Sequence, residues 1–209
     1  MKIYDWHAAP NPRRLHIFLA EKGIKIDLVE VDRENGRPAA WYVEKFPHAL
    51  VPMLELDDGT CIGEVPAIWR YFEQLQPEPR LLGIDAKDMA LVTMWEALAR
   101  DDGINRVAEV FRNTHPAFVD RALPGSAEPI PQLPELAQRG REGVARFFKK
   151  FDTQLSTNTY VVGEHYTVAD ITTLCVVDFA KRVGIDMPED CVNLRRWHAL
   201  VSARPSARA

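Results

Sequence analysis

The 209-residue sequence has few cysteines, and none at a spacing that is informative. The three are Cys61, Cys175 and Cys191. There is no Cys-x-x-Cys pair, and no cysteine lies at a zinc-ligand spacing from one of the six scattered histidines. A sparse, odd number of cysteines is typical of reduced thiols. We therefore expect a cytoplasmic protein that has no structural disulfide and holds no metal.

Long apolar runs and concentrated positive charge are also missing. No stretch approaches the roughly 20 apolar residues needed to cross a bilayer, and the first ten residues lack the apolar core of a signal peptide. Lys and Arg number 26 against 30 Asp and Glu. The basic residues between positions 139 and 150 stand among apolar ones at helical spacing, as on a solvated helix face. These absences indicate no membrane segment and no nucleic-acid partner.

The first part of the chain alternates between strand and helix patterns. Residues 2–6 and 24–31 have strand character. Between them, residues 13–22 carry apolar side chains at helical spacing up to Gly23, a typical helix stop. The connection is long enough for a parallel β-α-β crossover. A short helix is expected over 41–46.

The stretch from Val51 to Glu73 predicts a hairpin that leads into a helix. Residues 51–56 and 60–63 are strand candidates, and Asp57-Asp58-Gly59 between them is typical of a tight turn. Pro66 is expected at the first position of the following helix. A helix N-terminus beside a strand edge gathers backbone donors, which suits a small extended ligand that carries a carboxylate.

After the polar, proline-rich linker at 76–80 the pattern changes to long helices. Asp85 is expected to cap a helix that runs toward Phe111, and the proline-rich residues 124–134 must form a loop. Thr167-Val168-Ala169-Asp170 is a capping-box start for a buried helix. The sequence therefore predicts two domains, 1–80 and 86–209. The first has the order of a thioredoxin-like α+β domain, and the second is all-α, with its further helices over 136–155, 171–183 and 193–203.

Both halves resemble the glutathione S-transferase family. Its glutathione-binding segment reads Val-Pro, an Asp-Asp-Gly-type turn, and Glu-Ser-x-Ala-Ile before an aromatic helix, to which Val51-Pro52, 57–59 and 64–68 are similar. Its helical half carries Gly-x-x-(Phe/Tyr)-(Ser/Thr)-x-Ala-Asp-Ile, and Gly163 to Ile171 match it. The resemblance covers most of the chain. It implies a homodimer that uses glutathione as co-substrate against an electrophile.

The resemblance also implies a set of glutathione-binding residues. The Val51-Pro52 bond is expected to be cis, with a backbone that pairs with the cysteinyl unit, and Glu64 is expected to hold the γ-glutamyl ammonium. Val65 stands where a Ser or Thr hydroxyl normally binds the carboxylate. Val is also a poor helix cap. The expected donors to this carboxylate are therefore the backbone N–H groups of residues 65, 67 and 68. The expected glutathione-binding residues are Leu50, Val51, Pro52, Glu64 and Val65.

The chemistry of the family requires a stabilised thiolate, because a thiol of pKa about 8.5 is only a few per cent ionised at neutral pH. Many bacterial relatives read Ser-Pro-Asn-x-Arg-(Arg/Lys) where this chain has Ala9-Pro10-Asn11-Pro12-Arg13-Arg14. Ala9 replaces the serine, so Asn11 is the nearest side-chain donor and the expected catalytic residue. A backbone N–H alone, Tyr4, or no activation of the thiol are the alternatives.

The electrophile is expected between the two domains. Its predicted pocket residues are Ala9, Phe111, Arg112 and His115, and Arg70 with Asp101 or Asp102 could add charge there or across a dimer interface. The sequence is thus expected to encode a glutathione transferase. Two alternatives remain, a glutathione-dependent reductase of disulfides or peroxides, and a non-catalytic interaction domain of the same fold.

Overall fold

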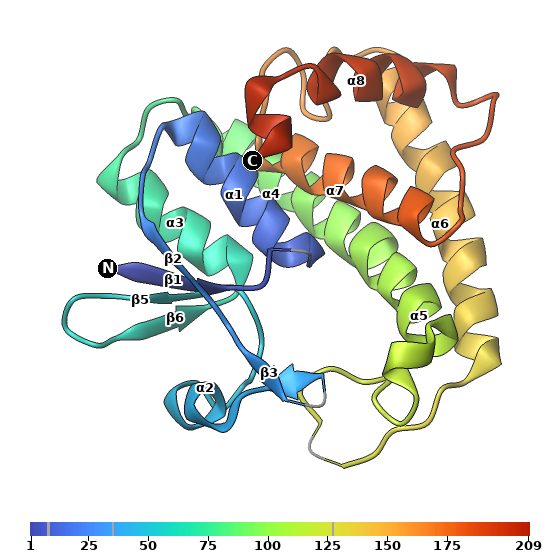
Figure 1. The fold of residues 1–209 in the computed structure, drawn as a ribbon. Helices are drawn as coiled ribbons and strands as arrows, with labels where there is room; N and C mark the ends of the chain where they lie inside the picture. The colour runs from blue at the N-terminus through green and yellow to red at the C-terminus, as the bar shows by residue number, and fades with distance from the viewer. Residues whose placement is uncertain (8, 35, 127) are drawn as a thin grey trace.

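The computed structural model describes residues 1–7, 9–34, 36–126 and 128–209 (Figure 1). Its main sheet has the order β2-β1-β5-β6, in which β1 and β2 are parallel and the other pairs are antiparallel. The four strands are β1 (Lys2–Asp5), β2 (Asp27–Glu30), β5 (Met53–Glu55) and β6 (Cys61–Gly63). A second, two-stranded sheet, which the sequence did not predict, consists of β3 (Arg33–Glu34) and β4 (Arg37–Pro38).

Helices cover both faces of the main sheet (Figure 1). Side chains alternate between the faces, so the neighbouring pairs Ile3–Leu54 and Tyr4–Met53 enter different cores. The first pair packs into the large core with α1 (Pro10–Lys22) and α3 (Val65–Leu75). The second pair packs against α2 (Ala40–Lys45). The thioredoxin-like order predicted for this half is confirmed.

The rest of the chain is helical, as predicted. The elements are α4 (Ala86–Ala99), α5 (Asn105–Thr114), α6 (Pro134–Leu155), α7 (Val168–Arg182) and α8 (Val192–Ser202), with the 3₁₀ turns η2 (Pro116–Phe118) and η3 (Pro205–Arg208). The helix predicted from Asp85 toward Phe111 is interrupted by one π turn, η1 (Arg100–Ile104). Gly103 lets this turn approach α7, since a Cβ there would lie 2.6 Å from Val176. None of the described helices combines the length and the apolar character of a membrane span.

Two contacts tie α1 to segments that follow α3, one in the linker and one at the end of the chain. Lys22 is buried, and its Nζ donates to the carbonyl oxygens of residues 76, 77 and 79, which fixes the linker that follows α3. Arg204 pairs with Glu21 through two hydrogen bonds of 2.8 and 2.7 Å, and η3 packs beside α1. The domain boundaries at 80 and 86 stay a prediction, but the halves share one apolar core.

Asp170 holds the start of α7 in place, and the predicted capping box is confirmed. Its Oδ2 accepts from the Thr167 N–H at 3.0 Å and its Oδ1 from the Val161 N–H and the Trp197 indole at 2.9 and 2.8 Å. Full burial raises the pKa of Asp170 to about 6, although these donors favour its ionised form. The carboxylate thereby joins the loop before α7 to α8.

Asp170→Asn should lower the free energy of unfolding by about 2–4 kcal/mol, because an amide NH₂ would face the N–H of Thr167 and leave buried donors unpaired. Urea unfolding followed by circular dichroism measures the change. Asp186→Asn is the control, since Asp186 is exposed and should tolerate the substitution within about 0.5 kcal/mol. Equal losses in the two variants would contradict this role of Asp170.

Candidate functional site

The loop before β5 presents an unpaired stretch of backbone. The Val51-Pro52 peptide bond is cis, as predicted. The Leu50 carbonyl accepts a hydrogen bond of 2.6 Å from the Tyr42 hydroxyl, which anchors the loop to α2. The N–H and C=O groups of Val51 bond to none of the described residues. An extended ligand could therefore pair with Val51 as an added strand would.

Glu64 has a strained backbone and an unpaired side chain. Its φ of 65° and ψ of 120° lie in a region that non-glycine residues rarely adopt, at a cost of about 1–3 kcal/mol. The carboxylate is exposed and has no hydrogen bond or ion pair among the described residues. Backbone strain of this kind persists only where the surrounding structure fixes the residue, and such residues are concentrated at functional sites. The geometry thus leaves an acidic group free to bind a cation.

The start of α3 differs in three ways from the sequence prediction. Glu64 rather than Val65 is the cap residue, and Pro66 is the second helical residue rather than the first. The N–H groups of Ala67 and Ile68, expected to face a ligand, instead bond to the Glu64 carbonyl at 3.0 and 3.1 Å. Because proline has no N–H, the one donor left at this helix start is the N–H of Val65.

The Val65 side chain belongs to the apolar core. It is 2% exposed and packs in the same cluster as Ile68 and Trp69. The valine that stands in place of the usual hydroxyl residue therefore contributes to core packing. The sequence pattern did not reveal this. Any anion at this helix end would rely on one backbone N–H and on the partial positive charge of the helix terminus.

The start of α1, which begins at Pro10 rather than at the predicted Arg13, is equally poor in donors. The N–H of Ala9, the cap residue, is taken by the Trp6 carbonyl at 2.9 Å. Pro10 and Pro12 have no N–H. Within the described part of the chain, the donors left at this terminus are the backbone N–H and the side-chain amide of Asn11.

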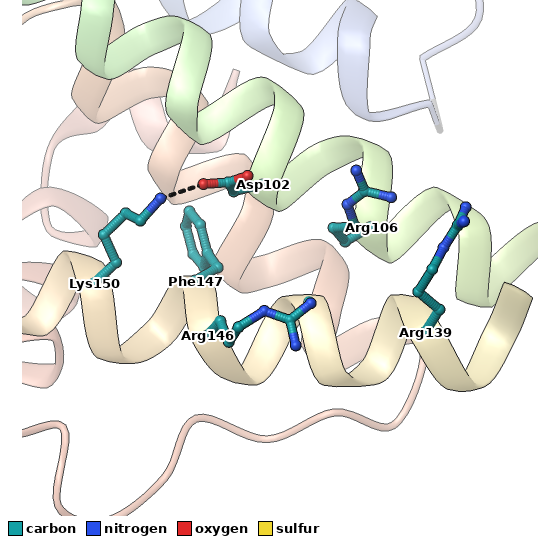
Figure 2. Close-up of a pocket in the computed structure, with 7 residues that line it drawn as sticks. Asp102, Arg106, Arg139, Arg146, Phe147 and Lys150 are labelled. Carbon is teal, nitrogen blue, oxygen red and sulfur yellow. Dashed lines mark hydrogen bonds and ion pairs between the residues drawn. The ribbon is translucent and has the colours of Figure 1, made fainter.

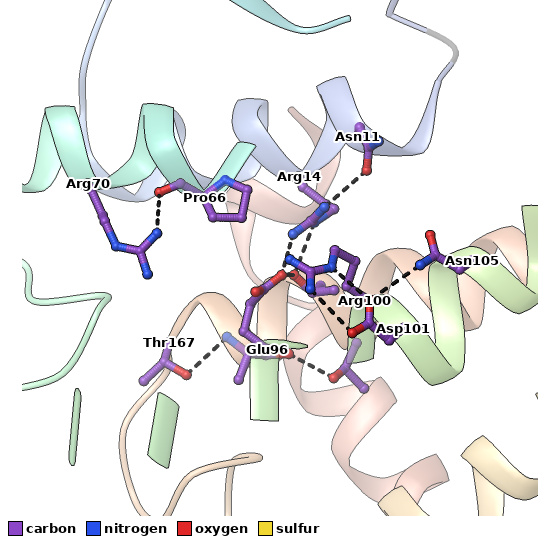
Figure 3. Close-up of polar contacts among 12 residues, drawn as sticks. Asn11, Arg14, Pro66, Arg70, Glu96, Arg100, Asp101, Asn105 and Thr167 are labelled. Carbon is purple, nitrogen blue, oxygen red and sulfur yellow. Dashed lines mark hydrogen bonds and ion pairs between the residues drawn. The ribbon is translucent and has the colours of Figure 1, made fainter. Parts of the chain in front are cut away.

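A buried arginine fixes the orientation of the Asn11 amide (Figure 3). Arg14 is 1% exposed, and its Nη1 donates to the Asn11 Oδ1 at 3.0 Å. Arginine has no acceptor, so the atom that faces it must be the amide oxygen. The Nδ2 of Asn11 is therefore the free end. A charged donor on Oδ1 also polarises the amide and strengthens Nδ2 as a donor.

The same guanidinium is held from the second half of the chain (Figure 3). Its Nε donates to the Thr172 hydroxyl on α7 at 3.0 Å, and its Nη2 forms an ion pair with Glu96 on α4. Burial lowers the pKa of Arg14, and the Glu96 carboxylate opposes that shift. Neither Thr172 nor Glu96 was assigned a role from the sequence. An acidic residue among helix-spaced apolar neighbours, as Glu96 is, was a signal of a buried charge.

Tyr4 is not available as a thiol donor. Its side chain is buried, and its hydroxyl donates to the Glu55 Oε2 at 2.7 Å. The ammonium of Lys45 and the hydroxyl of Tyr4 lower the pKa of Glu55 to about 2, so the acceptor is ionised. The ring packs at 5.8 Å from that of Trp41. Tyr4 is therefore a structural aromatic residue.

The predicted electrophile residues are brought together only in part. The Phe111 and His115 rings lie 5.0 Å apart, and the Arg112 guanidinium lies 5.0 Å from the centre of the Phe118 ring. His115 Nδ1 accepts from the Ala117 N–H, so it also caps a turn. These three residues pack with the Phe118 ring at the end of α5, and we call the group the aromatic cluster. Among the described residues, Ala9 forms its backbone hydrogen bonds with Trp6 and Arg13, in its own loop and helix.

The charged residues proposed as additions to the electrophile pocket lie in different surroundings. Arg70 donates to the Pro66 carbonyl at 3.3 Å and is exposed. Asp101 accepts from Arg100 on the side of the Arg14 network (Figure 3). Asp102 instead pairs with Lys150 across a groove of about 440 Å³ between α5 and α6 (Figure 2). The residues that line the groove are Asp102, Arg106, Arg139, Gly143, Arg146, Phe147 and Lys150. Of these, Asp102 alone was predicted as a possible charge at the electrophile pocket or across a dimer interface.

Comparisons with known proteins identify both halves. Residues 3–80 match the family model "Glutathione S-transferase, N-terminal domain", and residues 105–205 match "Glutathione S-transferase, C-terminal domain". The chain is 32% identical over 213 residues to "Glutathione S-transferase 2" of Saccharomyces cerevisiae, which covers all of this chain and 88% of that protein.

A solved structure and a second relative extend these matches. The crystal structure of a glutathione S-transferase domain-containing protein from Marinobacter aquaeolei superposes with a TM-score of 0.89 and 34% identity over 99% of each chain. "Elongation factor 1-gamma" of Rattus norvegicus is 27% identical over 176 residues, 80% of this chain. The match spans only 35% of the elongation factor, so it concerns about a third of that protein.

Proposed function

The chain belongs to the glutathione S-transferase family, and we propose that it binds glutathione and transfers its thiolate to a small electrophile. The observation that carries this proposal is the Asn11 amide, whose oxygen is held by buried Arg14 and whose Nδ2 is free. This amide lies at the start of α1, in the part of the fold that carries the unpaired backbone of Val51.

The cysteinyl backbone and the γ-glutamyl end of glutathione each have a partner of suitable chemistry. The cysteinyl backbone would pair with Val51, and the γ-glutamyl ammonium would pair with the unpaired carboxylate of Glu64. The γ-glutamyl carboxylate would accept from the N–H of Val65 at the start of α3. Leu50 and Pro52 shape the loop. Since only one N–H replaces the usual hydroxyl and N–H groups, we expect weak binding of this carboxylate.

Asn11 supplies two donors for the sulfur. Lowering the thiol pKa by about 2 units requires about 2.7 kcal/mol of differential stabilisation. A hydrogen bond to a charged group contributes about 1.5–3 kcal/mol, so Nδ2 and the backbone N–H together suffice. The thiolate lone pair then forms the carbon–sulfur bond, and the leaving group departs with its bonding electrons. The aromatic cluster of Phe111, Arg112 and His115 is the proposed wall for the electrophile.

The two alternatives predict different behaviour. A glutathione-dependent reductase would turn over disulfides or peroxides without conjugating chloroaromatic substrates. A non-catalytic interaction domain, as the partial similarity to elongation factor 1-gamma allows, would not be retained on immobilised glutathione. Retention together with conjugation supports the transferase, and the absence of both would refute it.

We also propose a cytoplasmic homodimer. The three cysteines are free thiols, and two of them are buried. The exposed surface of α4 carries Ala86, Ala90 and Met94 at four-residue spacing, so an uncharged stripe faces outward. A two-fold contact of this surface with a second copy would bury the stripe.

Substitution of Asn11 should separate binding from activation of the thiol. Asn11→Asp keeps the acceptor for Arg14 but replaces the Nδ2 donor by a negative oxygen. The pKa of bound glutathione should therefore rise to at least its free value, while glutathione affinity falls less than about threefold, since the other polar contacts of the ligand remain. Ultraviolet absorbance of the thiolate against pH measures the pKa, and calorimetry measures the affinity.

Asn105→Asp on α5 is the matched control, because the Asn105 side chain donates, within the described residues, to Asp101 and not to Arg14. An unchanged thiol pKa in Asn11→Asp, with binding intact, would remove Asn11 from the mechanism and leave a backbone N–H as the donor. Loss of binding in both variants would point to misfolding, which circular dichroism detects.

Val65→Thr should strengthen glutathione binding at a cost in stability. The change keeps the branched shape in the core but adds a hydroxyl that can donate to the carboxylate, worth about 1.5–3 kcal/mol or roughly tenfold or more in affinity. The buried hydroxyl should lower the free energy of unfolding by about 1–3 kcal/mol without ligand. Val144→Thr, in the core of α6, should lose stability without gaining affinity. Equal glutathione affinity in the wild type, Val65→Thr and Val144→Thr would contradict the proposed carboxylate site.

The assembly proposal predicts a mass of twice 23.7 kDa in light scattering at micromolar concentration. Met94→Glu should shift the protein toward the monomer, because it places a charge in the uncharged stripe of α4. Lys181→Glu, at the exposed end of α7, should leave the dimer intact. A wild-type monomer would refute the proposal.

A further inference from the structure

Three side chains with metal-binding atoms meet between β1 and α1. They are Asp5, the last residue of β1, His7 two residues later, and His16 in the middle of α1. One donor atom from each lies within 4.8 Å of the others. Asp5 and His16 are 3% and 7% exposed, whereas His7 is at the surface. The cluster is therefore open to solvent on one side only.

The buried groups of this cluster are not satisfied by the protein. Among the residues that the structure describes, Asp5 Oδ1 and His16 Nε2 have no hydrogen-bond partner. The His16 Nε2 lies 2.5 Å from the Asp5 Oδ2, but this approach does not meet the geometry of a hydrogen bond. A buried carboxylate oxygen and a buried imidazole nitrogen that lack hydrogen bonds cost free energy, which a cation between them would recover.

Ordinary histidine–carboxylate pairs in the same chain behave differently. His165 lies 2.9 Å from Asp88, and His198 lies 2.8 Å from Asp178, each with hydrogen-bond geometry. Each also has only one histidine. The Asp5–His16 pair is the more buried, lacks that geometry, and has a second imidazole, since the His7 ring stacks on His16 at 5.1 Å.

We propose that Asp5, His7 and His16 bind one divalent ion of the Zn²⁺ class. Two imidazoles and one carboxylate suit Zn²⁺ and Co²⁺, and three protein ligands leave one position for water. Ligand bonds of about 2.0–2.2 Å place tetrahedral donors about 3.3 Å apart. The contact between Asp5 and His16 must therefore widen, and His7 must move inward. The exposed His7 provides the entry path.

The ion would clamp the connection between β1 and α1, the helix that carries Asn11. It would neutralise the buried carboxylate and tie the loop after β1 to the middle of α1. This role is structural, because no donor of the cluster belongs to the proposed glutathione site. It is also independent of the proposed function, and the tests contain no glutathione, whose thiol binds metals.

Titration with Co²⁺ of the full chain, first treated with a chelator, tests the proposal. We expect one ion per chain with visible ligand-field bands, and a higher melting temperature with Zn²⁺. Binding should weaken in acid, because a protonated imidazole has no lone pair with which to coordinate the ion. A sulfur-to-cobalt charge-transfer band would place the ion at a cysteine such as Cys61 and overturn the assignment.

His7→Ala is the decisive variant, since His7 is exposed and its loss should not unfold the chain. Calorimetric affinity for Zn²⁺ should fall at least tenfold, as the loss of even an outer ligand partner costs about 10–100-fold. The control is His165→Ala, which removes an imidazole beside another carboxylate and should bind normally. Unchanged affinity in His7→Ala, or an equal loss in both variants, would refute the site.

Discussion

The buried guanidinium of Arg14 is the interaction on which the rest of the structure depends. It contacts α1 through Asn11, α4 through Glu96 and α7 through Thr172, so one side chain joins both halves of the chain. Removing one partner of a buried ion pair typically costs about 3–5 kcal/mol, because the other charge is left unpaired. The relative position of α1 and the helical half is therefore fixed by charge as well as by the apolar core. Asn11, at the start of α1, takes its orientation from that contact.

The candidate site is defined by how few donors remain. Pro10, Pro12 and Pro66 have no N–H, and the N–H groups of Ala9, Ala67 and Ile68 are bonded within the protein. The amide of Asn11 and the N–H groups of residues 11 and 65 are what the two helix starts can offer a ligand. With so few donors, the positions of Asn11 and Glu64 matter more than they would in a site rich in N–H groups. Glu64 is held in a strained conformation and Asn11 by a buried charge, so both are positioned before a ligand arrives.

The sequence predicted what depends on local patterns and missed what depends on distant contacts. Apolar spacing located the long helices, and Thr167-Val168-Ala169-Asp170 located the start of α7. The π turn at 100–104 was missed because Gly103 packs against Val176, a contact that spans 73 positions of the chain. The burial of Val65, the Arg14–Glu96 pair and the meeting of Asp5 with His16 were missed for the same reason, since each arises from packing between elements. The resemblance to a known family was enough to predict the fold and to propose Val51, Pro52 and Glu64 as site residues. It could not predict which backbone N–H groups around them are already hydrogen-bonded within the protein.

The Arg14 network bears on the choice between an enzyme and a domain that only binds partners. A buried ion pair is often no more stabilising than apolar side chains of similar volume, so stability alone does not account for it. What apolar residues at the positions of Arg14 and Glu96 could not do is hold the oxygen of Asn11 and leave its Nδ2 free. A domain that only binds other proteins has no need for a polarised amide whose Nδ2 is left free at the start of α1. A thiol transferase without the usual serine does need it, because the thiolate must be stabilised by a donor whose position is fixed before glutathione binds. The burial of Arg14 therefore favours catalysis, and it places the energetic cost of that catalysis in the interface between the two halves.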